Sequence, residues 1–129
     1  MKRSALCCAC LMVLLVYSGC SSSKQFAAIP AGLDLSNIPR QTVAITAERF
    51  RFTPDIIHVK GGTLVHLDLK ATNGTHGFQL SEYGIDESLD EGETKVIEFV
   101  AQQKGEFAFR CSHFCGLGHF GMKGTLIVE

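Results

Sequence analysis

The last quarter of the chain carries an unusual density of side chains that bind soft metal ions. Two cysteines, two histidines and a methionine fall within twelve residues, at Cys111, His113, Cys115, His119 and Met122. Packing does not account for such a cluster, and its thiol, imidazole and thioether groups suit copper better than other common metals. Thiolate stabilises Cu(I) and imidazole accommodates Cu(II), so a site that serves both oxidation states needs both ligand types. The spacing C-x3-C-x3-H-x2-M therefore predicts a copper site.

The N-terminus predicts an export signal. A basic start, Met1–Arg3, precedes an almost unbroken apolar run from Ala5 to Tyr17, which is shorter than the roughly 20 residues of a membrane-spanning helix. The run ends in Tyr17-Ser18-Gly19-Cys20, which resembles a bacterial lipoprotein lipobox and implies that Cys20 is acylated. An uncleaved signal anchor is the alternative. We expect a signal peptide at 1–19, a lipidated cysteine and flexible tether at 20–40, and a domain at 41–129 in the periplasm or on the outer cell surface.

Removal of the signal leaves two thiols, Cys111 and Cys115, besides the lipidated Cys20. In an oxidising compartment two such cysteines ordinarily form a disulfide, but a disulfide leaves His119 and Met122 unexplained. Without the two basic residues of the signal, 10 basic and 13 acidic residues remain, for a formal charge of −3. The sequence has no basic stripe with interleaved aromatics, so nothing predicts nucleic-acid binding.

From about Gln41 the chain is rich in β-branched and aromatic residues, with turn residues every ten or so positions. Apolar and polar residues alternate strictly over Val65–Lys70, as expected of a strand with one wet face. No segment has convincing helical periodicity, although Ser81–Leu89 is compatible with a short helical turn. The candidate strands are Thr42–Ala47, Ile56–Val59, Thr63–Lys70, Gly77–Leu80, Thr94–Val100, Glu106–Arg110 and Thr125–Val128. The pattern predicts an all-β fold, a small Greek-key β-sandwich or barrel.

A β-sandwich that carries a Cys/His/Met loop between its last two strands has the cupredoxin architecture. The run from Cys111 to Met122 resembles the loop of the binuclear copper A domain of cytochrome c oxidase subunit II and of nitrous oxide reductase. Such domains take a further histidine from an earlier turn, and His76 within Asn73–Phe78 stands at the equivalent place. The resemblance covers Thr42–Glu129.

This resemblance implies a complete ligand set for two copper ions. The thiolates of Cys111 and Cys115 would bridge the two coppers. One copper each would be bound by His76 and His119, with weak ligands from Met122 and from the backbone carbonyl of His113. The oxidases usually have glutamate at the position of His113, and this chain lacks the carboxylate that helps form an extra metal site in many of them.

The implied function is the relay of single electrons. Two bridging thiolates hold two coppers close together, so that one added electron spreads over both and each bond changes little. With no vacant ligand position, substrate chemistry at the copper is not expected, and the domain has no active site of its own. We expect it to pass electrons from a cytochrome or small copper protein to a terminal oxidase core subunit, or to act as a stand-alone carrier. The alternatives are a copper-trafficking protein that delivers Cu(I) to an oxidase and a single-copper cupredoxin.

Several other side chains have two interpretations. His58 and His66 lie in strand patterns and are expected to be solvated or structural. Phe114 and Phe120 flank the ligands and either shield the site or simply pack. The stretch from Glu82 to Glu93 holds six acidic residues and no lysine or arginine. It is either a solvated loop or a docking patch for a basic electron donor.

Overall fold

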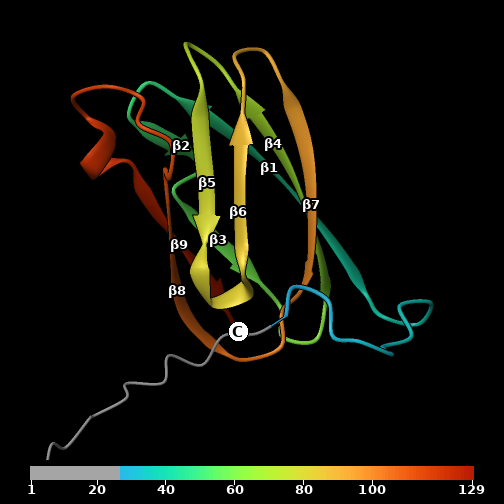
Figure 1. The fold of residues 1–129 in the computed structure, drawn as a ribbon. Coiled ribbons are helices and arrows are strands. Elements are labelled where there is room, and N and C mark those ends of the chain that lie inside the picture. Colours follow the sequence, from blue (N-terminus) through green and yellow to red (C-terminus); the bar gives the residue numbers. More distant parts are fainter. Residues whose placement is uncertain (1–26) are drawn as a thin grey trace, which may run out of the picture.

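The computed structural model describes residues 27–129, so the predicted signal and the lipidation of Cys20 lie outside the described residues. Two β-sheets face each other across one core (Figure 1). One sheet has the strand order β2-β1-β4-β7 and the other β3-β9-β8-β5-β6. The strands are β1 (Arg40–Glu48), β2 (Arg51–Thr53), β3 (Ile56–Val59), β4 (Leu64–Ala71), β5 (His76–Leu80), β6 (Ile85–Leu89), β7 (Thr94–Val100), β8 (Gly105–Arg110) and β9 (Lys123–Val128). The predicted all-β sandwich is confirmed.

The predicted alternation in β4 is borne out by its burial. Leu67 and Leu69 are buried, whereas Asp68 is half-buried and Lys70 is exposed. β4 is the second inner strand of its sheet, parallel to β1 and antiparallel to β7. Its apolar face therefore lies on the core, where each buried leucine contributes about 1.5–3 kcal/mol.

The second sheet forms the other wall of the core and carries the metal-ligand candidates at its ends. Phe78 of β5 and Phe109 of β8 are fully buried and pack against Phe52 of β2, with ring centroids 5.2–5.7 Å apart. These rings join the two sheets through contacts between aromatic edges and faces. They lie in the core at the end of the sandwich where β5 begins and β8 ends.

All seven candidate strands are present, each within two residues of the predicted bounds, and two strands were missed. β2 is three residues long, and β6 is rich in acidic residues of low β-propensity. β6 nevertheless pairs with β5 along its whole length, because Ile85 and Leu89 bury their side chains. The predicted helical turn is a 3-10 turn at Ser81–Tyr83. Residues 27–129 contain no α-helix and no helix long and apolar enough to cross a membrane.

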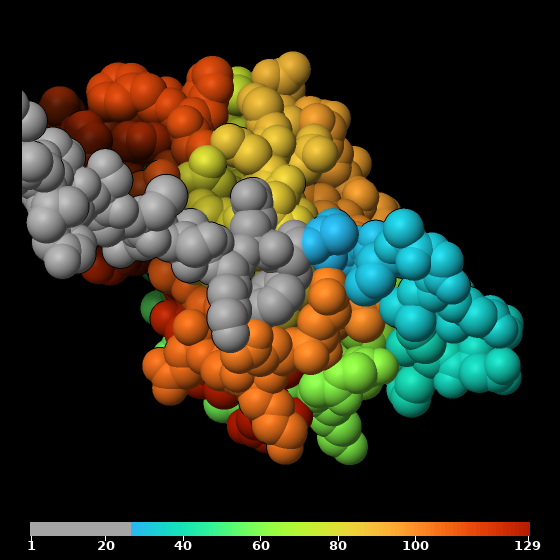
Figure 2. All heavy atoms as spheres, turned by 60° about the horizontal axis from the view of Figure 1, so that its bottom comes forward, coloured from blue at the N-terminus to red at the C-terminus, as the bar shows by residue number. Residues whose placement is uncertain are grey.

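The described residues before β1 lie partly against the domain. The backbone oxygen of Ala28 accepts a hydrogen bond from Val100 N at 2.8 Å, and that of Ala27 accepts one from the Gln102 side chain. In Figure 2 these blue residues lie beside the orange connection between β7 and β8. The predicted tether at 20–40 thus includes residues that contact the sandwich, and its boundary with the domain stays a prediction.

Candidate metal centre

The fold brings the predicted ligand residues together at one end of the sandwich. His76 is the first residue of β5, and Cys111 directly follows β8. Cys115 lies in the connecting loop, His119 opens a second 3-10 turn (His119–Gly121), and Met122 ends it. A hydrogen bond of 2.9 Å from Cys111 N to Met122 O closes the loop at its base. This loop, residues 111–122, is called the ligand loop below (Figure 1, orange to red).

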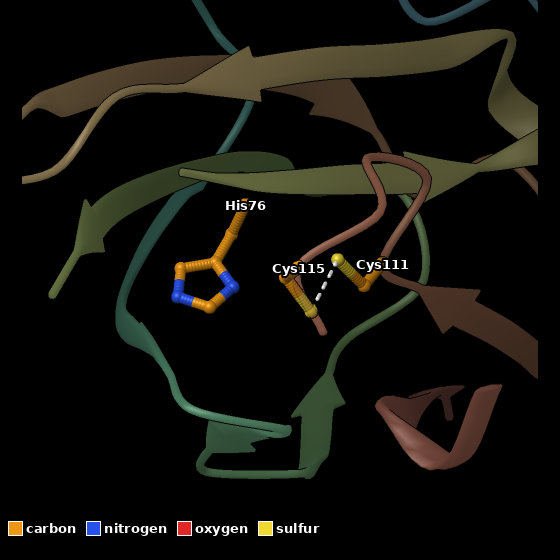
Figure 3. A group of neighbouring side chains, drawn as sticks. All are labelled: His76, Cys111 and Cys115. Carbon is orange, nitrogen blue, oxygen red and sulfur yellow. Dashed lines mark hydrogen bonds between the residues drawn. The ribbon is translucent and has the colours of Figure 1, made fainter. Parts of the chain in front are cut away.

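Sulfur and nitrogen atoms of the ligand residues lie within a few ångströms of one another. The thiols of Cys111 and Cys115 are 3.7 Å apart, and neither forms a disulfide. A ligand atom of His76 and both sulfur atoms lie within 4.8 Å of one another (Figure 3). The sulfur of Cys115 also lies 3.8 Å from His119 Nδ1 and 3.8 Å from the Met122 sulfur. Such a set of soft and borderline donors suits copper.

His76 is oriented as a metal ligand is. Its side chain is fully buried, and Nε2 lies 3.0 Å from the backbone oxygen of Thr72. The other ring nitrogen, Nδ1, is buried without a hydrogen-bond partner. A buried unpaired nitrogen is costly, whereas a metal-bound histidine typically donates its other N–H to a carbonyl or carboxylate. The residues present therefore fit a metal ion bound through the lone pair of Nδ1, while Nε2–H donates to the backbone oxygen of Thr72.

The environment of Cys111 includes two backbone groups. The amide of Gly77 donates to its sulfur at 3.4 Å, and the sulfur lies 3.0 Å from the His113 carbonyl oxygen. The His113 residue itself is exposed. Its carbonyl oxygen thus lies beside the Cys111 sulfur, at the position where the family resemblance implies a weak backbone ligand.

Protonation of the Cys115 thiol depends on its burial and on the neighbouring Cys111. Burial, followed by the hydrogen bond and the charge interaction with Cys111, raises the pKa of Cys115 to about 11 from its ordinary 9.0. In the metal-free protein this thiol therefore holds its proton at neutral pH. A metal ion must displace that proton to bind, because the thiolate is the ligand form.

Two close backbone approaches shape the ligand loop. A side chain at Gly118 would overlap the ring of Phe50, a residue of the β1–β2 turn with φ of +65°. Gly116 lies under the same ring. A side chain at Gly77 would overlap Ser112 and the His113 amide. Glycine is therefore required where β5 and the β1–β2 turn meet the loop.

The rim of the site is apolar and exposed. The rings of Phe114 and Phe120 lie 5.6 Å and 5.3 Å from the His119 ring, and they are 66% and 88% exposed. Leu117, between the second cysteine and His119, is 99% exposed. Both phenylalanines flank His119 on the surface and do not belong to the core.

The remaining candidates lie in salt bridges or hydrogen bonds. His58 pairs with Glu129 at 3.0 Å, and His66 lies between Asp68 and Glu98 at 3.4 Å and 3.1 Å. The acidic stretch 82–93 forms β6 and its flanking turns. Within it, Asp86 accepts from Ser112, Asp90 from Thr75, and Glu87 and Glu93 pair with Lys95. Much of its charge is thus engaged within the domain.

A family model described as a cupredoxin-like domain matches residues 8–128. The chain belongs to the cupredoxin-like family. Its relatives include subunit 2 of cytochrome c oxidase from Thermus thermophilus, 30% identical over 101 residues that span 78% of this chain and 75% of the relative. The nitrous-oxide reductase of Cupriavidus necator is 35% identical over 92 residues, 68% of this chain and 14% of the reductase.

A solved structure extends the likeness of this cupredoxin to three dimensions. The periplasmic domain of subunit II of cytochrome oxidase from Bradyrhizobium japonicum matches with a TM-score of 0.63 at 18% identity, over 68% of this chain and 83% of that one. The likeness shows a shared fold. Membership of the cupredoxin family, homology to subunit 2 and the cluster of His76 with two cysteines together imply copper binding.

Sequence reasoning missed four residues at the site of this cupredoxin. Thr72 holds His76 through a backbone oxygen, which any residue could supply, so its identity carried no signal. Phe50 and Asp86 contact the ligand loop from distant positions in the sequence, and Ser112 is the loop residue that Asp86 contacts. The glycines at 77, 116 and 118 were the available signal, since closely spaced glycines in a ligand run indicate close backbone approach.

Proposed function

We propose that this cupredoxin holds a binuclear copper A centre and relays single electrons. The observation that carries the proposal is His76, whose Nε2 is engaged by Thr72 while its unpaired Nδ1 is buried beside two unoxidised thiols. Neither a disulfide nor the surrounding core would supply a partner for this nitrogen, whereas a metal ion held by the thiols would. A donor set of two thiols close enough to share metal ions favours two coppers over one.

Six groups would hold the metal ions. Cys111 and Cys115 would bridge them, His76 and His119 would each bind one through a ring nitrogen, and Met122 and the His113 carbonyl would be weak ligands. The sulfur–sulfur distances of 3.7 Å and 3.8 Å from Cys115 to Cys111 and Met122 support this assignment. When bound, the copper pair supplies the uptake and release of one electron.

The protein keeps the ligands fixed between the two oxidation states. Cys111, His76 and Met122 are 4%, 0% and 1% exposed, so core packing restricts their rotamers and keeps water away. His119 lies toward the surface between Phe114 and Phe120. A partner protein that contacts this apolar rim would come within a few ångströms of a ligand, which favours electron transfer across the rim.

The relatives favour a role beside a terminal oxidase. Homology to an oxidase subunit 2 supports an electron path from a cytochrome c or small copper protein to an oxidase core subunit, with this domain as entry point. We further propose that lipidated Cys20 attaches the exported domain to a membrane, on the strength of the lipobox-like sequence. Metabolic labelling with palmitate tests this step, since a Cys20→Ser variant should not be labelled.

Copper counting with paramagnetic resonance tests the proposed centre. The copper-loaded protein should contain two coppers per chain that share one unpaired electron, with hyperfine lines from both nuclei. Cys115→Ser should lose the shared signal, whereas His58→Gln, a histidine paired with Glu129 outside the site, should keep it. One copper per chain supports a single-copper cupredoxin. A silent Cu(I) form that air does not oxidise supports copper trafficking.

A further inference from the structure

A chain of polar side chains crosses the sheet surface and ends on the ligand loop. Arg110 Nε donates to Gln79 Oε1 at 2.7 Å, and Gln79 Nε2 donates to Asp86 Oδ2 at 3.0 Å. The other carboxylate oxygen of Asp86 accepts from Ser112 Oγ at 2.5 Å. These residues come from β8, β5, β6 and the ligand loop in turn, so the hydrogen bonds connect three adjacent strands to the loop.

Strand pairing holds the Asp86 carboxylate in place. Gln79 faces Asp86 on one side and Arg110 on the other in the strand register. Each side chain therefore reaches its neighbour directly across the sheet, where cross-strand pairs interact most strongly. Because Gln79 holds Oδ2 from the neighbouring strand, the Asp86 carboxylate is oriented independently of the loop, with Oδ1 left for Ser112. Asp86 thus presents a fixed acceptor to Ser112.

Ser112 lies between two groups of the proposed copper site. Its neighbours in sequence are Cys111 and His113, whose sulfur and carbonyl oxygen lie 3.0 Å apart. The backbone of Ser112 rests on Gly77, whose amide donates to the Cys111 sulfur at 3.4 Å. Because Ser112 shares its backbone with both residues, its displacement away from the sheet would shift the Cys111 sulfur and the His113 carbonyl relative to Gly77.

We propose that Asp86 and Ser112 are positioning residues that fix the Cys111 sulfur and the His113 carbonyl for metal binding. The inference rests on the proposed copper function and adds a role for one carboxylate of the acidic stretch. The loop is open to solvent on this side, where a cavity of about 370 Å³ is lined by Asp86, Ser112 and His119 among others. Packing holds the buried Cys111 side chain but not the exposed residues Ser112 and His113, where a charge-assisted hydrogen bond supplies the restraint.

Five variants of the full chain test the proposal by their effect on loop order. Ser112→Ala and Asp86→Ala each remove one partner, and their combination closes a double-mutant cycle. Asp86→Asn keeps an oxygen acceptor for the serine hydroxyl and is the conservative rescue. Glu91→Ala is the matched control, because it removes an exposed carboxylate of the same acidic stretch.

Hydrogen exchange of the metal-free protein is the first measurement. The amides of Cys111 and His119 are protected by loop hydrogen bonds to Met122 and Gly116. Each alanine variant at 86 or 112 should exchange these amides roughly threefold to tenfold faster, as expected for loss of a partly exposed charged hydrogen bond. The double variant should be no faster than either single variant, and Asp86→Asn should lie between the wild type and Asp86→Ala, because it keeps one acceptor oxygen and loses the charge.

Paramagnetic resonance of the copper-loaded variants is the second measurement. Ser112→Ala and Asp86→Ala should change the hyperfine pattern in the same way, because both remove the contact that positions the Cys111 sulfur. If either alanine variant matches Glu91→Ala in both measurements, or if the effects of Ser112→Ala and Asp86→Ala add, the positioning role of Asp86 and Ser112 is wrong. Failure of the wild type to bind two coppers would overturn the proposed function instead. The exchange data on the metal-free loop would still report on the contact between Asp86 and Ser112.

Discussion

In the proposed copper centre, Met122 would combine a structural and a chemical role that one substitution can separate. Its side chain is 1% exposed, and its sulfur lies 3.8 Å from that of Cys115. Leucine has nearly the same volume but no sulfur, so Met122→Leu should lower the free energy of unfolding by less than about 1.5 kcal/mol. The copper-loaded variant should nevertheless show a changed reduction potential, because one weak ligand is lost.

The control for this prediction is Met122→Ala, which removes the sulfur and also leaves a cavity. Its free energy of unfolding should fall by about 2–5 kcal/mol. Denaturant unfolding and potentiometric titration measure the two effects independently. A leucine variant with unchanged reduction potential would mean that Met122 only packs.

Cys115 makes the stability of the metal-free protein depend on pH. Its pKa in the folded protein is raised from 9.0 to about 11, so folding favours the protonated thiol. The resulting stabilisation is fully present below about pH 9 and is lost as the pH rises through about 11. Urea unfolding of the metal-free protein across this interval should show a falling midpoint. In Cys115→Ser the fall should be smaller, since only the other alkaline groups titrate, and an equal fall would contradict the assignment.

At the residue scale the sequence predicted which side chains gather at the candidate metal centre, but not the residues that position them. Cys111, Cys115, His119 and Met122 share one loop, so their spacing alone indicated a common site. His76 joined them through its resemblance to a known loop pattern. Phe50 and Asp86 lie 26 or more positions from the ligand loop residues that they contact, at Gly118 and Ser112. The spacing of residues along the chain does not reveal contacts between distant segments such as these.

The ligand loop depends on a close fit with the turn between β1 and β2. A side chain at Gly118 would overlap the Phe50 ring, so Gly118→Ala should lower the free energy of unfolding by about 1–3 kcal/mol. Gly121→Ala is the matched control in the same loop, because nothing lies within 4 Å of the added carbon. Its effect should stay within about 0.5 kcal/mol.

The cause can be isolated by removing the ring. Phe50→Ala makes room for the added methyl group, so combining it with Gly118→Ala should cost less than the sum of the two single changes. Thermal or urea unfolding of the four proteins measures this coupling. Additive effects would show that Phe50 does not restrict the loop.

Strand prediction succeeded where one face of a strand is buried and failed where pairing overrides composition. β4 alternates and was found, whereas β6 contains two acidic residues and a serine between its buried ends. β6 is the edge strand of its sheet, where charged residues are tolerated and discourage pairing with other chains. Its acidic composition, which suggested a loop or a docking patch, is thus compatible with a strand.

Across the whole molecule, the apolar core and the end that carries the candidate metal centre are separate. The leucines of both sheets and four of their phenylalanines, Phe52, Phe78, Phe99 and Phe109, are buried, while three large apolar residues at one end, Phe114, Leu117 and Phe120, are exposed. Exposed apolar residues gathered around a buried site typically mark a contact surface. Beside them lies the acidic stretch, in which Lys95 already pairs with Glu87 and Glu93. The apolar rim should therefore supply most of the affinity for a donor, and the carboxylates mainly long-range attraction.

Stopped-flow reduction of the copper-loaded protein by a basic cytochrome c separates these two contributions. Leu117→Ser should slow the second-order reaction by roughly fivefold to tenfold at every salt concentration, as for loss of an apolar contact at the centre of an interface. Glu87→Gln combined with Glu91→Gln should slow it mainly at low salt, because charges more than about 10 Å apart are screened at 0.1 M. His58→Gln, outside the rim, should change neither rate. A reaction that is insensitive to both Leu117 and the carboxylates would place electron entry on another face of the molecule.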